Sequence, residues 1–97
     1  MYNQLLNKMN KGYTINFFSY KEEGSVLSEF ESVVIRKDRL TFFYEDEPAK
    51  RIYGEKTIKE YLKKMVENTL YNKDCFKLIE FKKDAETKTI HIEFKKI

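Results

Sequence analysis

The sequence has 97 residues, of which 41% are hydrophobic, 36% charged and 15% aromatic, and its formal net charge is +3. This length allows one domain, so we expect residues 1–97 to form a single unit. The composition is too apolar for a disordered chain, and no apolar run approaches the roughly 18 residues of a membrane helix. The first residues lack the pattern of a signal peptide, and a lone cysteine, Cys75, excludes an internal disulfide. We therefore expect a cytoplasmic α+β domain.

The N-terminal region predicts a short helix followed by a strand. Residues 3–11 place apolar side chains at helical spacing, and Gly12 stands where a left-handed residue would end the helix. Residues 13–20 alternate between two faces, which predicts a strand. Residues 21–24 then predict a hairpin turn, because the final glycine is free to adopt positive φ.

Two further strands are expected before residue 48. Residues 26–37 form a β-like run whose alternation breaks at 32–34, and we interpret the break as a bulge. A turn and a strongly β-forming run at 40–44 follow. Pro48 and the acidic residues before it end that strand, since proline lacks the donor for a ladder hydrogen bond.

The C-terminal half predicts one long helix and a β-hairpin. Residues 57–72 have an apolar stripe at helical spacing, and Thr57 with Glu60 three residues later has the pattern of a capping box. Residues 76–82 and 88–96 predict two strands joined by a turn. In the last strand the apolar side chains alternate with polar ones.

The element order α-β-β-β-α-β-β predicts an α+β two-layer sandwich. Because most connections are short, we expect a five-stranded antiparallel sheet with both helices on one face. The other face would carry polar side chains together with three aromatic ones, Phe18, Tyr20 and either Phe42 or Phe43. Such a face is either covered by loops or the N-terminal helix, or it contacts a partner or a second copy of the chain.

The sequence shows no set of catalytic residues. His91, the one histidine, alternates out of phase with its apolar neighbours and is expected at the surface, whereas Cys75 is expected to be a small buried residue. One histidine and one cysteine do not suffice for a structural zinc site. The acidic cluster 45–47 is typical of a solvated turn, and the isolated glycines do not form a phosphate-binding loop. We therefore expect that the protein is not an enzyme and that it binds neither a cofactor nor a metal.

Charge divides the chain, with a net −2 over residues 1–48 and +5 over 49–97. A patch of lysines in the C-terminal half would attract a phosphate backbone, so one alternative is weak, sequence-tolerant nucleic-acid binding. Its candidate residues are Lys63, Lys64, Lys82, Lys83, Lys95 and Lys96. The same lysines would also protect an edge hairpin against aggregation, and the 16 Lys against 3 Arg fit an AT-rich genome.

The preferred interpretation is a small non-enzymatic protein-interaction module. The AT-rich residue usage and the size are typical of accessory proteins of phages or mobile elements, which inhibit or redirect a host protein. Aromatic side chains supply most of the binding energy of interface hot spots, and charge steers the encounter. The candidate contact residues are Phe18, Tyr20, Phe43, Glu45, Asp46 and Glu47. A homodimer through the open sheet face is compatible with this interpretation.

Overall fold

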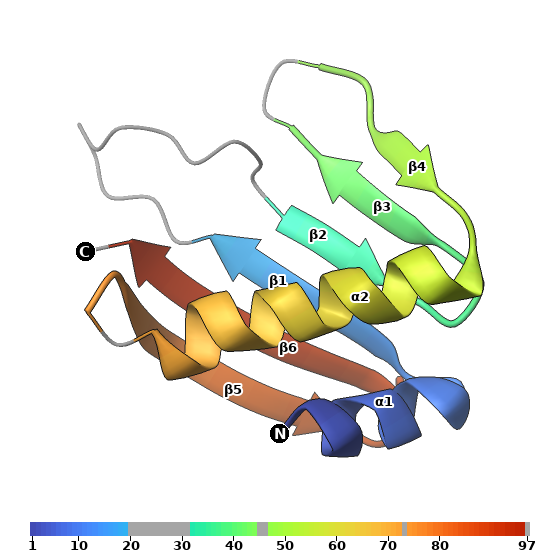
Figure 1. Cartoon of the computed structure of the whole chain (residues 1–97). Coiled ribbons are helices and arrows are strands. Elements are labelled where there is room, and N and C mark those ends of the chain that lie inside the picture. The colour runs from blue at the N-terminus through green and yellow to red at the C-terminus, as the bar shows by residue number, and fades with distance from the viewer. Residues whose placement is uncertain (20–31, 45–46, 73, 97) are drawn as a thin grey trace.

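The computed structural model describes residues 1–19, 32–44, 47–72 and 74–96, which form two helices and a six-stranded mixed sheet (Figure 1). The helices are α1 and α2, and a single π-helical segment, η1, continues α2. In chain order the elements are α1 (Tyr2–Asn10), β1 (Thr14–Ser19), β2 (Ser32–Ile35), β3 (Leu40–Phe43), β4 (Lys50–Ile52), α2 (Glu55–Val66), η1 (Glu67–Tyr71), β5 (Phe76–Asp84) and β6 (Thr89–Lys96).

The sheet has the strand order β4-β3-β2-β1-β6-β5, so the expectation of a five-stranded antiparallel sheet is wrong. β1 pairs with β6 in parallel, and every other neighbouring pair is antiparallel. The parallel pair lies inside the sheet, between β2 and the edge strand β5, and both of its strands bury their inward side chains completely or nearly so. Ile15 and Phe17 of β1 lie beside Ile90 and Ile92 of β6.

Both helices cover the same face of the sheet, as the sequence predicts (Figure 1). The hydrophobic core lies between the two layers. From the helices it contains Leu5, Met9, Ile58, Leu62, Met65 and Val66, and from the strands Ile15, Phe17, Val33, Ile35, Leu40, Phe42, Ile90, Ile92 and Phe94. No helix in the described ranges is both long and apolar enough to cross a membrane.

The predicted end of the first helix is confirmed. Gly12 has φ +93°, its N–H donates to the Met9 carbonyl at 3.0 Å, and the Tyr13 N–H donates to the Lys8 carbonyl at 3.0 Å. These two bonds form a Schellman motif, in which a left-handed glycine lets the last helical carbonyls find donors. The motif also turns the chain directly into β1.

The predicted capping box at the second helix is not formed. α2 begins at Glu55, after Gly54 with φ +113°, and no side chain caps its first turn. Thr57 is therefore already inside the helix, and it is exposed. The end of the helix also differs from a regular one, because η1 has a π-helical turn in which the buried Thr69 hydroxyl donates to the Met65 carbonyl at 2.6 Å.

Three further local predictions meet different outcomes. The bulge expected at residues 32–34 is absent, since β2 pairs with β1 in unbroken register; a register shift occurs instead in β5, between Leu78 and Glu80. Cys75, expected to be buried, is exposed in the turn before β5. The predicted turn at 21–24 lies outside the described residues.

Candidate interaction surface on the open face of the sheet

The face of the sheet opposite the helices is defined by the strand register. Side chains that alternate with the core residues point to this side, which we call the open face. Its members are Thr14, Asn16 and Phe18 of β1, Ser32 and Val34 of β2, Thr41 and Phe43 of β3, Arg51 of β4, Glu80, Lys82 and Asp84 of β5, and Thr89, His91 and Glu93 of β6.

Two phenylalanines of the open face lie in one row across neighbouring strands. Phe18 pairs with Ser32, and Ser32 pairs with Phe43 on its other side. The two phenylalanines therefore lie two strands apart, and each strand spacing is about 4.8 Å. Phe18 is half-buried, whereas the Phe43 side chain is 41% exposed. The residue between them in this row is the small Ser32.

Polar groups lie next to this row. The ring of His91 lies 5.9 Å from that of Phe18, and its Nε2 is 4.0 Å from Oε1 of Glu93. Asn16, the cross-strand neighbour of His91, has a buried Oδ1 that no donor of the described residues satisfies. A buried acceptor without a donor lowers the stability of the folded chain, and because it is covered it does not face a partner.

The β5–β6 side of the open face is hollowed. A shallow depression of about 450 Å³ is lined by Glu80, Lys82, Asp84, Thr87, Thr89 and His91. At its end Asp84 accepts hydrogen bonds from the backbone N–H groups of Glu86 at 2.9 Å and Thr87 at 3.3 Å. These backbone donors, that of Thr87 first, lower the pKa of the Asp84 carboxyl. The acid thus fixes the β5–β6 turn and supplies a negative charge to the depression.

The structure brings together two of the six protein-binding residues predicted from sequence. Phe18 and Phe43 share the open face, and Phe43, not Phe42, is the ring of its pair that points there. Glu47 is exposed between β3 and β4. Tyr20, Glu45 and Asp46 lie outside the described residues.

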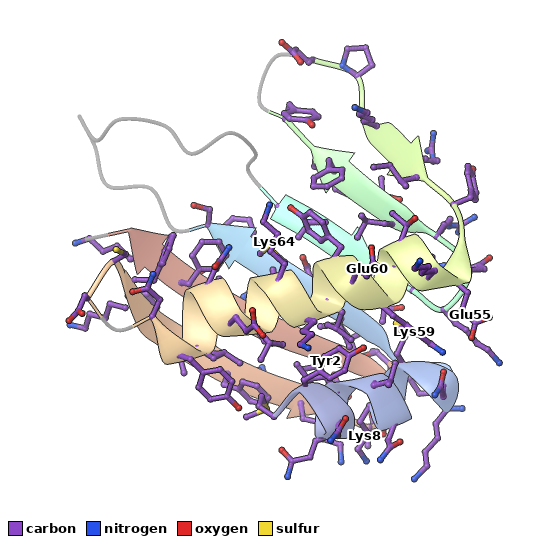
Figure 2. All side chains as sticks on the ribbon, in the orientation of Figure 1. Tyr2, Lys8, Glu55, Lys59, Glu60 and Lys64 are labelled. Atoms are coloured by element: carbon purple, nitrogen blue, oxygen red, sulfur yellow. The ribbon has the colours of Figure 1, made fainter. Side chains whose placement is uncertain are left out.

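The lysines of the nucleic-acid alternative are distributed over different surfaces. Lys63 and Lys64 are exposed on α2, in the helix layer, where Figure 2 labels Lys64. Lys82 and Lys83 are consecutive residues of β5 and therefore point to opposite faces of the sheet. Lys95 pairs with Lys77 near the end of β6, and Lys96 is the last residue of that strand.

A basic cluster that the sequence analysis missed lies where α1 meets the sheet. The Nζ atoms of Lys8 and Lys83 lie 5.2 and 5.8 Å from the centre of the Tyr13 ring. The contact with Lys83 lowers the pKa of the Lys8 ammonium, with a smaller effect from Lys11. Neither the helix nor the strand pattern indicated this cluster, because it depends on the register that places Lys83 beside the end of α1.

The helix layer has a second shallow hollow, of about 510 Å³, between α1 and the start of α2. Its walls include Tyr2 and the ion pair between Glu55 and Lys59, 2.8 Å apart, which Figure 2 shows side by side on α2. The pair lowers the pKa of Glu55 and raises that of Lys59. Lys56, Glu60 and Lys63 line the rest of this hollow.

Neither the local chemistry nor the comparisons assign an activity. Among the described residues no three of His, Cys, Asp and Glu come close enough together to hold a metal ion. No protein-family model, no curated protein and no solved structure matches this chain.

Proposed function

We propose that this protein is a small non-enzymatic interaction module that binds another protein through the open face of its sheet. The observation that supports this most directly is the position of Phe18 and Phe43. They share one row of the sheet face on which neither helix packs, and Phe43 leaves 41% of its side chain exposed. An accessory protein of a phage or mobile element that occupies a host protein in this way would inhibit or redirect it.

The energetics of the face favour a protein as the partner. Exposed aromatic side chains such as Phe43 are enriched at interface hot spots, where an apolar side chain of the partner packs against them. The charged depression on β5 and β6 places polar groups on one side of the apolar row. An apolar centre with a polar rim is the usual anatomy of a protein interface.

The dispersal of the lysines makes the nucleic-acid alternative the weaker proposal. Binding along a phosphate backbone needs several cations on one surface. Here Lys82 and Lys83 point to opposite faces, and Lys63 and Lys64 belong to the helix layer. Three of the open-face residues nearest Lys82, namely Glu80, Asp84 and Glu93, are acidic and would repel phosphates.

The test is capture of a partner from lysate of the source organism with wild-type protein and with Phe43→Ala, followed by affinity measurement on the captured protein. We expect one stoichiometric protein that survives nuclease and raised salt. Loss of a central aromatic contact weakens binding by at least about tenfold, and Phe18→Ala is expected to act in the same direction.

The matched control is Tyr53→Ala, because Tyr53 is 64% exposed but lies in the connection between β4 and α2. It should bind like the wild type. Circular dichroism of each variant shows whether the fold is intact. If the captured protein binds Phe43→Ala and Tyr53→Ala equally well, the open face is not its binding surface; recovery of nucleic acid alone, lost at high salt, would support the lysine alternative.

A further inference from the structure

β5 is a long strand at the edge of the sheet formed by the described residues. It spans nine residues, and its neighbour in the sheet is β6 alone. Three large apolar side chains of this strand are exposed by 40–43%, namely Leu78, Ile79 and Phe81. An exposed edge of this length is a template for a further strand, since its outward backbone donors and acceptors have no sheet partner.

The charges on this edge are unbalanced within one molecule. Glu80 has Glu93 as its cross-strand neighbour, so two carboxylates face each other on the open face. The cross-strand neighbour of Lys82 is His91. In the part of the chain that the structure describes, neither Glu80 nor Lys82 forms an ion pair within 4 Å. Like charges directly opposite one another destabilise a sheet, so a cation placed beyond the edge would stabilise Glu80.

We propose that the protein self-associates by antiparallel pairing of β5 with β5 of a second copy, about a two-fold axis at Phe81. In this register Glu80 lies opposite the partner's Lys82, and by symmetry Lys82 lies opposite the partner's Glu80. Each Glu80 thereby gains a cation directly opposite it, where its own sheet places Glu93.

The neighbouring registers do not provide this match. An axis at Glu80 places two carboxylates opposite each other, and an axis at Lys82 places two ammonium groups opposite each other. An axis at Phe81 also pairs Phe81 with the partner's Phe81, and aromatic cross-strand pairs are stabilising. Charge and apolar contact therefore select the same register.

The pairing places equivalent faces of the two sheets on the same side of the dimer. A two-fold axis perpendicular to the sheet leaves the helices of both copies on one side and the two open faces on the other. Glu80 and Lys82 belong to the open face, whereas Phe81 points to the helix side, beside Ile92. The result is one continuous sheet in which the open faces of both copies stay accessible, so the inference does not depend on the proposed function.

The same edge limits how far the pairing extends. The register shift between Leu78 and Glu80 disturbs the regular ladder at one end, and Lys77 and Lys83 flank the apolar residues. Such features restrict edge-to-edge association, and a two-fold contact is closed, so it gives dimers and not fibres. The short pairing belongs with the small interfaces of weak complexes.

Sedimentation velocity on the full chain, from about 10 µM to about 1 mM, covers the range of weak interfaces. We expect the wild type to pass from monomer to dimer over this range. Glu80→Lys and Lys82→Glu should each weaken the dimer at least about tenfold, because the two-fold axis turns each change into two like-charge contacts. The double variant with both changes exchanges the charges and should restore the dimer.

The matched controls are Glu60→Lys and Lys64→Glu, which reverse charges four residues apart on the exposed side of α2 (Figure 2). They should leave the dimer unchanged, and so should Phe43→Ala on the open face. A wild type that stays monomeric at about 1 mM overturns the proposal. The proposal is also overturned if either single charge reversal leaves the dimer affinity unchanged. It is overturned as well if the double variant does not recover the dimer affinity of the wild type. Loss of the dimer in Phe43→Ala alone would assign self-association to the open face.

Discussion

The stability of the β5–β6 turn depends on the charge state of Asp84. Its carboxylate accepts the backbone N–H groups of Thr87 and Glu86, and these bonds lower its pKa in the folded protein. In the unfolded chain the same group has the ordinary pKa of about 3.9. A lowered folded-state pKa means that the stabilisation is fully present above about pH 4 and is lost as the pH falls through the folded-state value.

We therefore expect Asp84→Asn to lose part of the acid dependence of stability. The wild type should become less stable as the pH falls below about 4, and the variant should show a smaller loss over the same range. Urea unfolding at several pH values measures this.

Glu86→Gln is the control for Asp84, because Glu86 contributes its backbone N–H and not its carboxylate to the turn. This variant should follow the wild type. If Asp84→Asn and the wild type lose stability in parallel on acidification, the carboxylate does not stabilise the turn through these bonds.

Single residues were predictable from sequence where the backbone imposed the requirement. Gly12 was identified from its place after a helical pattern, and its positive φ confirms the reason. Cys75 was assigned to the interior from the general behaviour of free cysteines, and it is exposed. Burial depends on which distant elements pack nearby, and one residue's type does not contain that information.

At the scale of elements, helix faces were predicted better than helix ends. The stripe of Ile58, Leu62, Met65 and Val66 is buried as its spacing indicates. The start was misplaced because Thr57 and Glu60 fit a capping box, whereas Gly54 already begins the helix at Glu55. A capping pattern and two ordinary residues of a first turn look alike in sequence.

This difference gives a direct prediction for Thr57→Ala. If Thr57 capped the helix, its loss would cost about 1 kcal/mol. Because Thr57 is exposed inside α2, we expect the free energy of unfolding to change by less than about 0.5 kcal/mol. Chemical denaturation measures the change.

Leu62→Ala is the positive control for Thr57→Ala, since Leu62 is fully buried on the same helix. It should cost about 2–5 kcal/mol. A loss of about 1 kcal/mol in Thr57→Ala would mean that its hydroxyl caps the helix after all.

Strands were predicted where alternation is long and apolar. β6 alternates over its whole length, and its inward residues Ile90, Ile92 and Phe94 are buried as expected. β4 was missed because it has three residues, of which Lys50 and Arg51 are exposed. So short and polar a strand is defined by pairing with β3, not by a pattern of its own.

For the whole molecule, the sequence predicted the two faces of the sheet but not the order of its strands. Alternation assigned Phe18 to the face away from the helices and His91 to the surface, and the register places both on that face. The neighbours of each strand depend on contacts between distant parts of the chain, which short connections do not determine. The parallel pairing of β1 with β6 joins the first and last strands, so the composition of the open face could be predicted but its rows could not.

The strand order predicts a specific pattern of amide hydrogen exchange. In a sheet whose sequential strands are neighbours, the last strand would be an edge, with every second N–H unpaired. β6 instead lies between β1 and β5, so its successive N–H groups point alternately to two paired neighbours. We expect uniformly slow exchange along residues 89–94, as slow as in β1, and fast exchange at alternate positions of β4. The measurement is made by NMR at about 10 µM protein or with Glu80→Lys, so that pairing of β5 does not contribute. Alternating fast and slow exchange along β6 would place that strand at an edge and contradict the parallel contact with β1.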